Sequence, residues 1–270
     1  NDSLEFKADR DHIGILERFG FAHEVIGRPA IRAQEPELSD RIGLAVLFPQ
    51  NRTIKDPCKL VRALANRFQA LGGKIETGEV ARFIRAERIR EVVLKDGRGL
   101  HADEVVICAG AFSARLAKDL GEPIPMETER GYHTQIMAPG ISMQHAIIWP
   151  ARAFMVSPTA GGIRVGGTVE MAGLDAAPDW RRSKITVRRA REALPNLKCE
   201  DFSEWMGHRP ALPDTVPILS ESARTRGVFY ATGHGHLGLT HAATTARLMG
   251  ELITGARPAL DLRPYRINRF

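Results

Sequence analysis

The pattern of hydrophobic and polar positions predicts helices and strands in alternation over the first 120 residues. Asp56-Pro57 indicates a helix start, because Asp caps exposed backbone N–H groups and Pro is tolerated at the first helical position. Gly72-Gly73 ends this helix. The apolar residues between these signals fall on one helical face: Leu60, Val61, Leu64, Phe68 and Leu71.

Shorter patterns surround this helix. Residues 12–27 are predicted to be helical in part, with a turn at 27–29, and residues 113–120 form a short helix. Asp96-Gly97 indicates a hairpin between residues 90–94 and 99–102. The other strands predicted in this half comprise residues 42–48, 74–76, 80–85 and 104–108.

The middle of the chain is rich in strands, and its end returns to a strand followed by a helix. A charged helix is predicted over residues 180–194, a last strand over 228–231 and a last helix over 239–254. Gly161-Gly162 joins the last two strands of the middle block, which has the predicted strands 132–137, 146–149, 153–157 and 163–169.

This order predicts a mixed α/β (α+β) fold in which two domains are interleaved. A Rossmann-like domain would comprise residues 51–120 and 207–270. A domain with an antiparallel sheet would comprise residues 1–50 and 121–206.

Composition limits the class of protein. Hydrophobic residues make up 43% and charged residues 26%, as in ordinary soluble proteins, and no apolar run approaches the roughly 18 residues of a membrane span. The net charge of +6 is spread along the chain and aromatic residues are only 6%, so no nucleic-acid partner is expected. Cys58, Cys108 and Cys199 lack metal-ligand or Cys-x-x-Cys spacing, which favours reduced thiols in a cytoplasmic protein. The start, residues 1–7, has neither an initiator Met nor an apolar signal core and resembles a chain entered partway through.

The strongest local signal is Gly233-His-Gly-His-Leu-Gly238, which lies between the last predicted strand and the last helix. A G-x-G-x-x-G turn here would place a ligand on a helix N-terminus. A complete dinucleotide-binding unit also needs a second strand with an acidic residue, and Pro258 follows the helix without room for one. Either close ligand approach or a plain glycine turn explains the motif. His234 and His236 form H-x-H without a third ligand at recognisable spacing, so no metal is predicted.

Two further residues are candidates for ligand contact. Arg209 precedes Pro210 in a rigid, proline-rich segment, and its planar guanidinium suits a carboxylate. The residues alone favour the simpler interpretation, in which Arg209 pairs with Asp214 or a backbone carbonyl. Tyr132 is likewise more typical of a half-buried strand residue than of a ligand contact.

Taken in order, several segments between residues 31 and 255 resemble the FAD-dependent D-amino acid oxidase superfamily. The bacterial D-amino acid dehydrogenases are most similar, followed by glycine and sarcosine oxidase-like members. The segments that carry the resemblance are residues 35–38, Pro49 with Asp56-Pro57, residues 72–75 with Val80, residues 105–110, Arg130-Gly-Tyr132, residues 166–168, Arg209-Pro210 with Pro213-Asp214 and Pro217, and residues 233–240.

The resemblance implies roles for these residues. Arg209 and Tyr132 would bind the substrate, and Arg209 would hold its carboxylate. The positive end of the last helix would face the flavin ring. No acid–base catalytic residue is implied. The implied FAD contacts are Val80, Ala109, Gly110, Gly233, His234, Gly235, His236, Leu237, Gly238 and Leu239.

The chain departs from the superfamily at its start, where an N-terminal G-x-G-x-x-G segment of somewhat over a hundred residues is expected by resemblance. A longer enzyme, a partner subunit or a truncated, inactive relic would each account for this, and the chain alone is expected to bind FAD weakly or not at all. The implied function is oxidation of a D-amino acid or small secondary amine to an imino acid, by hydride transfer to flavin. The alternatives are a non-catalytic fragment or subunit without FAD, and a His-based metal protein.

Overall fold

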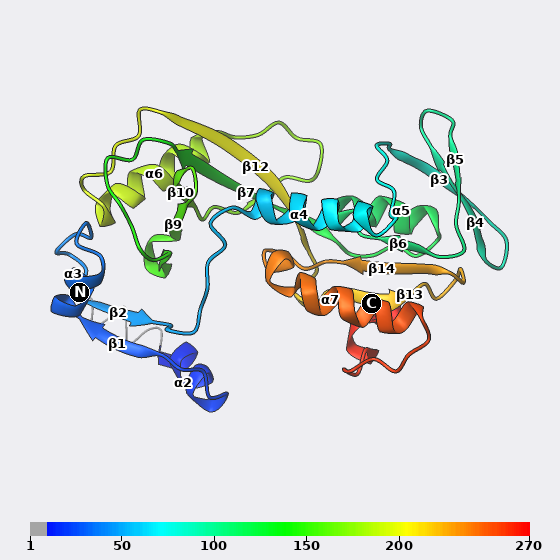
Figure 1. Cartoon of the computed structure of the whole chain (residues 1–270), viewed down its shortest axis with the longest axis horizontal. Coiled ribbons are helices and arrows are strands. Elements are labelled where there is room, and N and C mark those ends of the chain that lie inside the picture. Colours follow the sequence, from blue (N-terminus) through cyan, green and yellow to red (C-terminus); the bar gives the residue numbers. More distant parts are fainter. Residues whose placement is uncertain (1–9) are drawn as a thin grey trace. The chain divides into compact units, whose positions relative to one another are not determined.

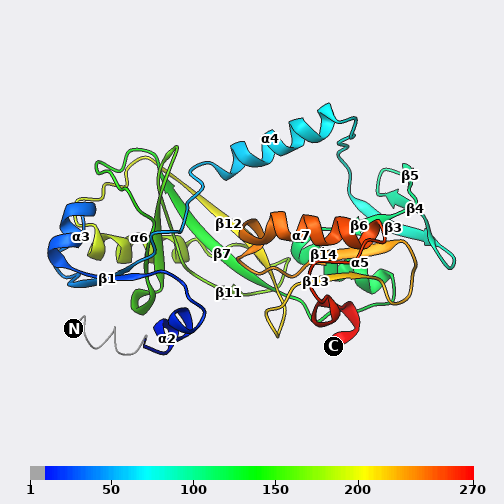
Figure 2. The same cartoon turned by 60° about the horizontal axis from the view of Figure 1, so that its bottom comes forward.

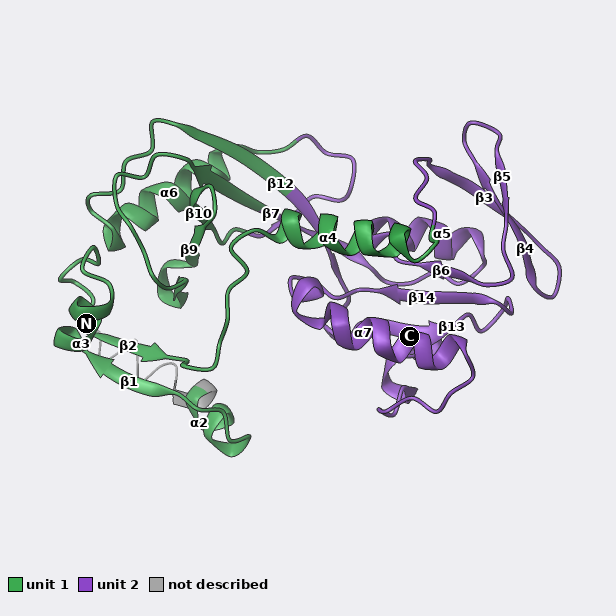
Figure 3. Ribbon diagram, in the orientation of Figure 1, with its two compact units in different colours: residues 1–73, 132–168, 178–206 green, residues 74–131, 169–177, 207–270 purple. Residues whose placement is uncertain are grey.

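The computed structural model describes residues 10–270, which form two compact units built from separate stretches of the chain (Figure 1). Unit 1 comprises Asn1–Gly73, Tyr132–Thr168 and Pro178–Met206 (Figure 3). Unit 2 comprises Lys74–Gly131, Val169–Ala177 and Gly207–Phe270. The mixed α/β fold with antiparallel sheets is confirmed. Residues 1–7, which resemble the sequence of a chain entered partway through, lie outside the described residues.

The units divide the chain differently from the domains expected from the sequence. The two divisions share only the break between residues 206 and 207. None of the described side chains of helix α4 (Pro57–Ala70) is buried. Side-chain packing therefore does not show to which of the two units this helix belongs. The segment before it is joined to unit 1 by a bond from Ala160 N–H to Lys55 O of 3.0 Å. The domain boundaries therefore stay a prediction.

Unit 1 is built around antiparallel strands. In the large sheet the strand order is β11-β7-β10-β9-β8, and β12 pairs with β7. Strands β7 and β12 each include residues of both units. The elements with residues in unit 1 are α2 (Arg10–Arg18), β1 (Glu24–Gly27), α3 (Arg28–Gln34), β2 (Leu44–Leu47), α4, β7 (Glu127–Ile136), β8 (Ile147–Trp149), β9 (Phe154–Thr159), β10 (Gly162–Gly166), α6 (Arg181–Ala193) and β12 (Phe202–Ala211).

The core of unit 1 forms where α6 packs on β9 and β10. Side chains alternate across a strand, so Thr134 and Ile136 of β7 are buried, whereas His133 and Gln135 are only partly buried. Ile136 and Val165 pack against Ala190 and the residues around it. The apolar half of the alternation therefore faces the helix.

Unit 2 contains two three-stranded sheets, with orders β3-β4-β5 and β13-β14-β6. Strands β14 and β6 are parallel. Figures 1 and 2 show α7 running along β13 and β14, where Leu248 and Met249 pack on Leu219 and Phe229. Its elements are β3 (Val80–Arg85), β4 (Ile89–Leu94), β5 (Gly99–His101), β6 (Val105–Ile107), α5 (Ser113–Asp119), β11 (Glu170–Met171), β13 (Ile218–Glu221), β14 (Val228–Thr232) and α7 (Gly238–Ile253).

Local signals in the sequence correspond to real starts and turns. Asp56 Oδ1 accepts the Lys59 N–H at 2.9 Å and caps α4, as predicted. Gly97 has φ +89° in the turn between β4 and β5. Where a turn was predicted at residues 27–29, helix α3 begins instead, because Pro29 fits a first helical turn as well as it fits a bend.

Two other expectations were wrong in detail. Residues 74–76 form no strand, and β7 begins five residues before the predicted start at Tyr132. Strand β13 was not predicted, because its four residues carry no alternation. Within the described chain, no helix has both the length and the apolar character needed to cross a bilayer.

Candidate functional site: a glycine loop beside Arg209

The glycine loop of unit 2 (residues 233–238) directly follows β14, and its backbone at two positions has a conformation that glycine adopts most easily. Gly233 has φ +84° and Gly235 has φ +54°. A Cβ at Gly233 would lie 2.3 Å from Cδ1 of Leu212, so a side chain is excluded there by packing as well. A Cβ at Gly235 would meet no atom within 4 Å. The loop is thus packed on one side and open on the other.

Hydrogen bonds connect this loop to two other predicted segments. Gly235 N–H donates to Pro210 O at 2.9 Å, which joins the loop to the segment that carries Arg209. Thr232 Oγ1 donates to Gly110 O at 3.0 Å, which joins the end of β14 to the Ala109-Gly110 turn. Gly110, the loop and Arg209, which are far apart in the sequence, are thus brought together in unit 2.

The N-terminus of α7 is open to a ligand. Within the described chain no side chain caps the helix at Leu237. Leu237 and Leu239 are 42% and 47% exposed, so bulky neighbours do not cover this end. Helix N-termini have N–H groups without intrahelical partners and a partial positive charge. This end of α7 therefore suits an electron-rich or anionic group.

The two loop histidines differ. His234 Nε2 lies 2.9 Å from Thr245 Oγ1, which holds the loop against α7. Burial, together with nearby His241, lowers the pKa of His234, so this ring is neutral at pH 7. His236 is exposed. No group of three or more potential metal ligands occurs among the described residues.

Arg209 lies on β12 against the backbone of β7. A Cβ on Gly131 would come within 2.1 Å of Arg209 Nη2, so the absence of a side chain at Gly131 makes room for the guanidinium. Burial lowers the pKa of Arg209, and Glu129 opposes this shift. Asp214 binds Arg269 at 2.7 Å, and the pairing of Arg209 with Asp214 or a backbone carbonyl stays a prediction.

The other predicted residues belong to other sheets or have structural contacts. Val80 begins β3, in the sheet β3-β4-β5 rather than the sheet that carries the loop. Tyr132 belongs to unit 1 and is 1% exposed. Its hydroxyl accepts the Asp179 N–H at 2.9 Å, and its ring meets Trp180 edge-on at 5.8 Å. The roles predicted for Val80 and Tyr132 stay predictions.

Sequence reasoning missed the buried charge next to Gly131. Arg130 is 0% exposed and donates to the carbonyl oxygens of Gly173, Ala176 and Ala177 at 2.8, 2.6 and 3.2 Å. Glu170 lies 3.7 Å away. Arg130 therefore fixes residues 173–177 to β7 within unit 2. The Arg130-Gly-Tyr132 motif was the available signal, although nothing in it indicates which carbonyls the guanidinium binds.

His208, the neighbour of Arg209, was also missed. Its Nδ1 lies 3.0 Å from Thr128 Oγ1, and its ring meets Phe112 edge-on at 5.9 Å. Burial, with a contribution from Arg130, lowers the pKa of His208. The ring is therefore neutral at pH 7 and does not repel an anion from its own side of the strand.

Unit 1 has a polar sheet face of its own. His133 stacks on Trp205 at 5.1 Å between centroids, and Arg164 Nε donates to Gln135 Oε1 at 3.3 Å. Burial and the charge of Arg164 lower the pKa of His133 to about 4. This face carries an uncharged imidazole beside an aromatic ring.

Comparisons with known proteins show the family of this chain. The family described as FAD dependent oxidoreductase matches residues 2–252. A D-amino-acid oxidase of Bradyrhizobium diazoefficiens is 34% identical over 261 residues, which cover 95% of this chain and 62% of that protein. A D-amino acid dehydrogenase of Rhizobium johnstonii is 30% identical over 273 residues, which cover 98% of this chain and 65% of that protein.

The fold is shared with solved structures. The glycine oxidase of Geobacillus kaustophilus superposes with a TM-score of 0.84 at 22% identity, covering 97% of this chain and 70% of that one. The glycine oxidase of Bacillus cereus gives 0.86 at 22% identity, covering 100% and 74%. At this identity the likeness concerns the fold. The chain spans less than two thirds of the length of the Bradyrhizobium diazoefficiens D-amino-acid oxidase and of the Rhizobium johnstonii D-amino acid dehydrogenase.

Proposed function

Because this chain belongs to the FAD-dependent oxidoreductase family, we propose that it forms the major part of an enzyme that oxidises an amino acid. The substrate is a D-amino acid or a small secondary amine, and the product is the imino acid, which water hydrolyses. The D-amino-acid oxidase and D-amino acid dehydrogenase relatives support a D-amino acid as substrate.

One contact carries the proposal. The Gly235 N–H donates to the Pro210 carbonyl, so the residue next to Arg209 is bonded to the loop at the start of α7. A cation suited to a carboxylate thus belongs to the same unit as an uncapped helix N-terminus. An enzyme that oxidises an amino acid needs both: one group to hold the substrate and another to stabilise charge on the electron acceptor.

The residues of unit 2 fit FAD as ligand. Gly235 has open space beside it, and within the described chain the N–H groups at the start of α7 have no side-chain cap. We propose that residues 233–239, the Ala109-Gly110 turn and the main chain at Val80 hold the cofactor. FAD, when bound, supplies the hydride acceptor. The partial positive charge of the α7 N-terminus stabilises negative charge placed against it.

Substrate binding rests on Arg209. Its guanidinium presents parallel N–H donors that match both oxygens of a carboxylate. Gly131 lets the guanidinium lie on the β7 backbone, and this position limits its conformations. The proposed chemistry is orientation of the substrate Cα–H without an acid–base residue of the chain. Tyr132 remains a proposed substrate contact, and a Tyr132→Phe variant with an unchanged KM would remove it.

The test is an Arg209→Leu variant of the full-length protein loaded with FAD. Loss of a charged partner at a partly buried site should weaken transition-state binding by about 2–5 kcal/mol, seen mainly as a higher KM for carboxylate substrates. Flavin content should stay unchanged. The control is Arg90→Leu, which removes an exposed Arg of β4 in the same unit. An unchanged KM in Arg209→Leu would refute the assignment.

The alternative, a non-catalytic fragment or subunit, differs in flavin binding. We propose that a further segment, in the same polypeptide or in a partner subunit, completes the FAD site. Flavin absorbance should then appear only when that segment is present. If the completed protein contained no flavin, the enzymatic function would be rejected. A His-based metal protein would instead require bound zinc, iron or copper in metal analysis.

We also propose that the protein is cytoplasmic. Cys58, Cys108 and Cys199 are all free thiols, which supports a reducing compartment. Fractionation of the producing cells would test this, and recovery from an oxidising compartment would contradict it.

A further inference from the structure

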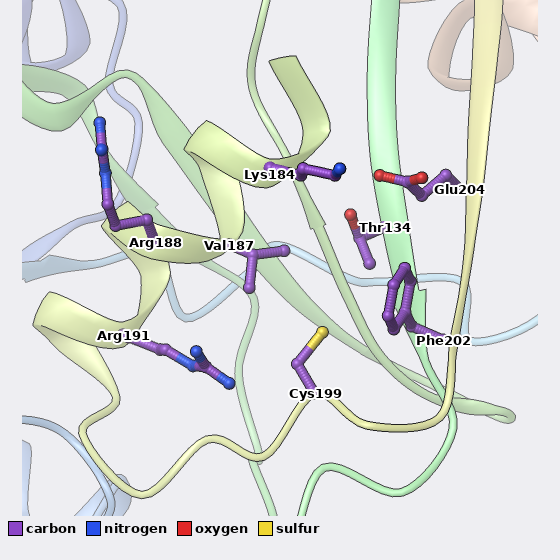
Figure 4. A pocket seen from close by; sticks show the side chains of 8 residues that line it. All are labelled: Thr134, Lys184, Val187, Arg188, Arg191, Cys199, Phe202 and Glu204. Carbon is purple, nitrogen blue, oxygen red and sulfur yellow. The ribbon is translucent and has the colours of Figure 1, made fainter. Parts of the chain in front are cut away.

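Unit 1 contains a pocket that the proposed function does not use. It has a volume of about 320 Å³ and lies between α6, strands β7 and β12, and the segment before β12 (Figure 4). This volume is within the range of small-molecule sites, about 300–1,000 Å³. Its lining residues are Thr134, Lys184, Val187, Arg188, Arg191, Cys199, Phe202 and Glu204.

A buried hydroxyl in this pocket lacks a partner. Thr134 is 1% exposed, and within the described chain its Oγ1 has no hydrogen bond. Two other buried hydroxyls of unit 1 have partners: Thr186 Oγ1 donates to Ser183 O at 2.7 Å, and the Ser183 hydroxyl donates to the Glu204 carboxylate. A buried polar group without a partner costs free energy, so such groups point to an absent ligand or water.

Charges of both signs line the same pocket as this hydroxyl. Figure 4 shows the Thr134 hydroxyl turned toward the side-chain ends of Lys184 and Glu204, which face one another. The Glu204 carboxylate is held in place because it also accepts the Ser183 hydroxyl. A ligand with a carboxylate and an ammonium group on neighbouring atoms would match this pair.

The rest of the lining combines an apolar part with two arginines, Arg188 and Arg191. Val187 and Phe202 present hydrocarbon surface, and Figure 4 shows Cys199 between them and Arg191, with Arg188 turned away. Burial, together with Glu204 and against Arg191, raises the pKa of the Cys199 thiol, so this sulfur is uncharged at pH 7. An apolar side chain of a ligand would fit against these three residues.

We propose that this pocket binds a free α-amino acid with an apolar side chain, its carboxylate on Lys184 and the Thr134 hydroxyl and its ammonium on Glu204. All its lining residues belong to unit 1, whereas Arg209 belongs to unit 2. Neither FAD nor turnover is needed for binding. Failure of this proposal and failure of the proposed function are therefore distinguishable.

The test measures protection of Cys199 from iodoacetamide, quantified by peptide mass spectrometry on the whole protein. Cys58 and Cys108 are exposed thiols outside the pocket and serve as internal controls. The probes are D- and L-phenylalanine, 3-phenylpropionate without the ammonium, phenethylamine without the carboxylate, and inorganic phosphate. Phenylalanine of at least one hand should slow alkylation of Cys199 alone, at a concentration at least about tenfold lower than either truncated probe requires.

Protection by phosphate or phenylpropionate at concentrations as low as phenylalanine would overturn the proposal, because a simple anion site would explain it. Absence of protection by phenylalanine would overturn it as well.

Variants separate the roles of the three polar groups. Thr134→Val should weaken phenylalanine binding about tenfold or more, since a hydrogen bond to a charged group is lost. It should leave the melting temperature of the free protein equal or higher, since an unpaired buried hydroxyl is removed. Glu204→Gln should weaken phenylalanine and not phenylpropionate, whereas Lys184→Met should weaken both.

The matched control is Lys118→Met, which removes an exposed lysine of α5 in unit 2 and should change neither probe. A Thr134→Val protein with a lower melting temperature and unchanged phenylalanine binding would show that the hydroxyl serves the fold, and would refute the assignment.

Discussion

His133 should make the stability of the protein depend on pH in a way that can be calculated from its surroundings. Burial and the charge of Arg164 lower its pKa from 6.5 to about 4. Between these values the unfolded chain binds a proton that the folded protein does not. The stabilisation due to neutral His133 is therefore present above pH 6.5 and is lost as the pH falls toward 4.

The size of the effect follows from the shift. A difference of about 2.5 pKa units corresponds to about 3.4 kcal/mol at about 1.36 kcal/mol per unit. His133 is only partly buried, so water screens part of this, and we expect about 2–3 kcal/mol.

Urea unfolding of the wild type and of His133→Gln, measured from pH 7.5 to pH 4, isolates this contribution. The difference in unfolding free energy between the two proteins should shift by about 2–3 kcal/mol in favour of the variant as the pH falls. Because all other titrating groups are shared, they cancel in this difference. A difference that stays constant across the range would refute the argument from burial and Arg164.

Three substitutions test close packing and buried hydrogen bonds. Gly131→Ala keeps an allowed backbone conformation, but its Cβ would displace the Arg209 guanidinium. The KM for a carboxylate substrate should therefore rise about tenfold with little loss of stability. An unchanged KM would contradict the role of Gly131 in making room for Arg209. Gly233→Ala combines backbone strain at φ +84° with a steric clash against Leu212. It should lower the free energy of unfolding, measured in urea titrations, by about 2–4 kcal/mol. A smaller loss would mean that the loop relaxes around the added methyl group. Glu35→Ala removes a buried carboxylate that accepts the His145 backbone N–H at 2.5 Å and lies 2.9 Å from its Nδ1. It should lower the free energy of unfolding in urea titrations by about 2–5 kcal/mol, whereas the exposed control Glu24→Ala should change it little, and equal losses would contradict this role.

Features that depend on interactions between neighbouring residues could be predicted from the sequence. The Asp56 cap, the Asp96-Gly97 hairpin and the strand–glycine–helix order around Gly233 depend on neighbours within a few residues, and the structure has all three. The apolar stripe of α4 was also visible, although Val61, Leu64 and Phe68 remain more than half exposed in the described chain.

Partners distant in sequence could not be predicted. Arg269 binds Asp214, 55 residues away in the sequence, with two parallel bonds, and no local pattern indicated this pair. Arg130 gave no indication of residues 173–177, because its partners are backbone carbonyls, which every residue has. The Thr134 pocket joins α6 to β7 and β12, and its residues share no motif.

The mixed α/β class, the starts of helices and turns, and the family resemblance could be predicted from the sequence, since these depend on short-range backbone preferences and on ordered motifs. Three results required the three-dimensional structure: the bond between the glycine loop and the segment of Arg209, the side of β7 that is buried, and the pocket that a threonine hydroxyl shares with charges of both signs. Those results depend on which strands pair and in which register, because a shift of one residue would turn every side chain to the opposite face.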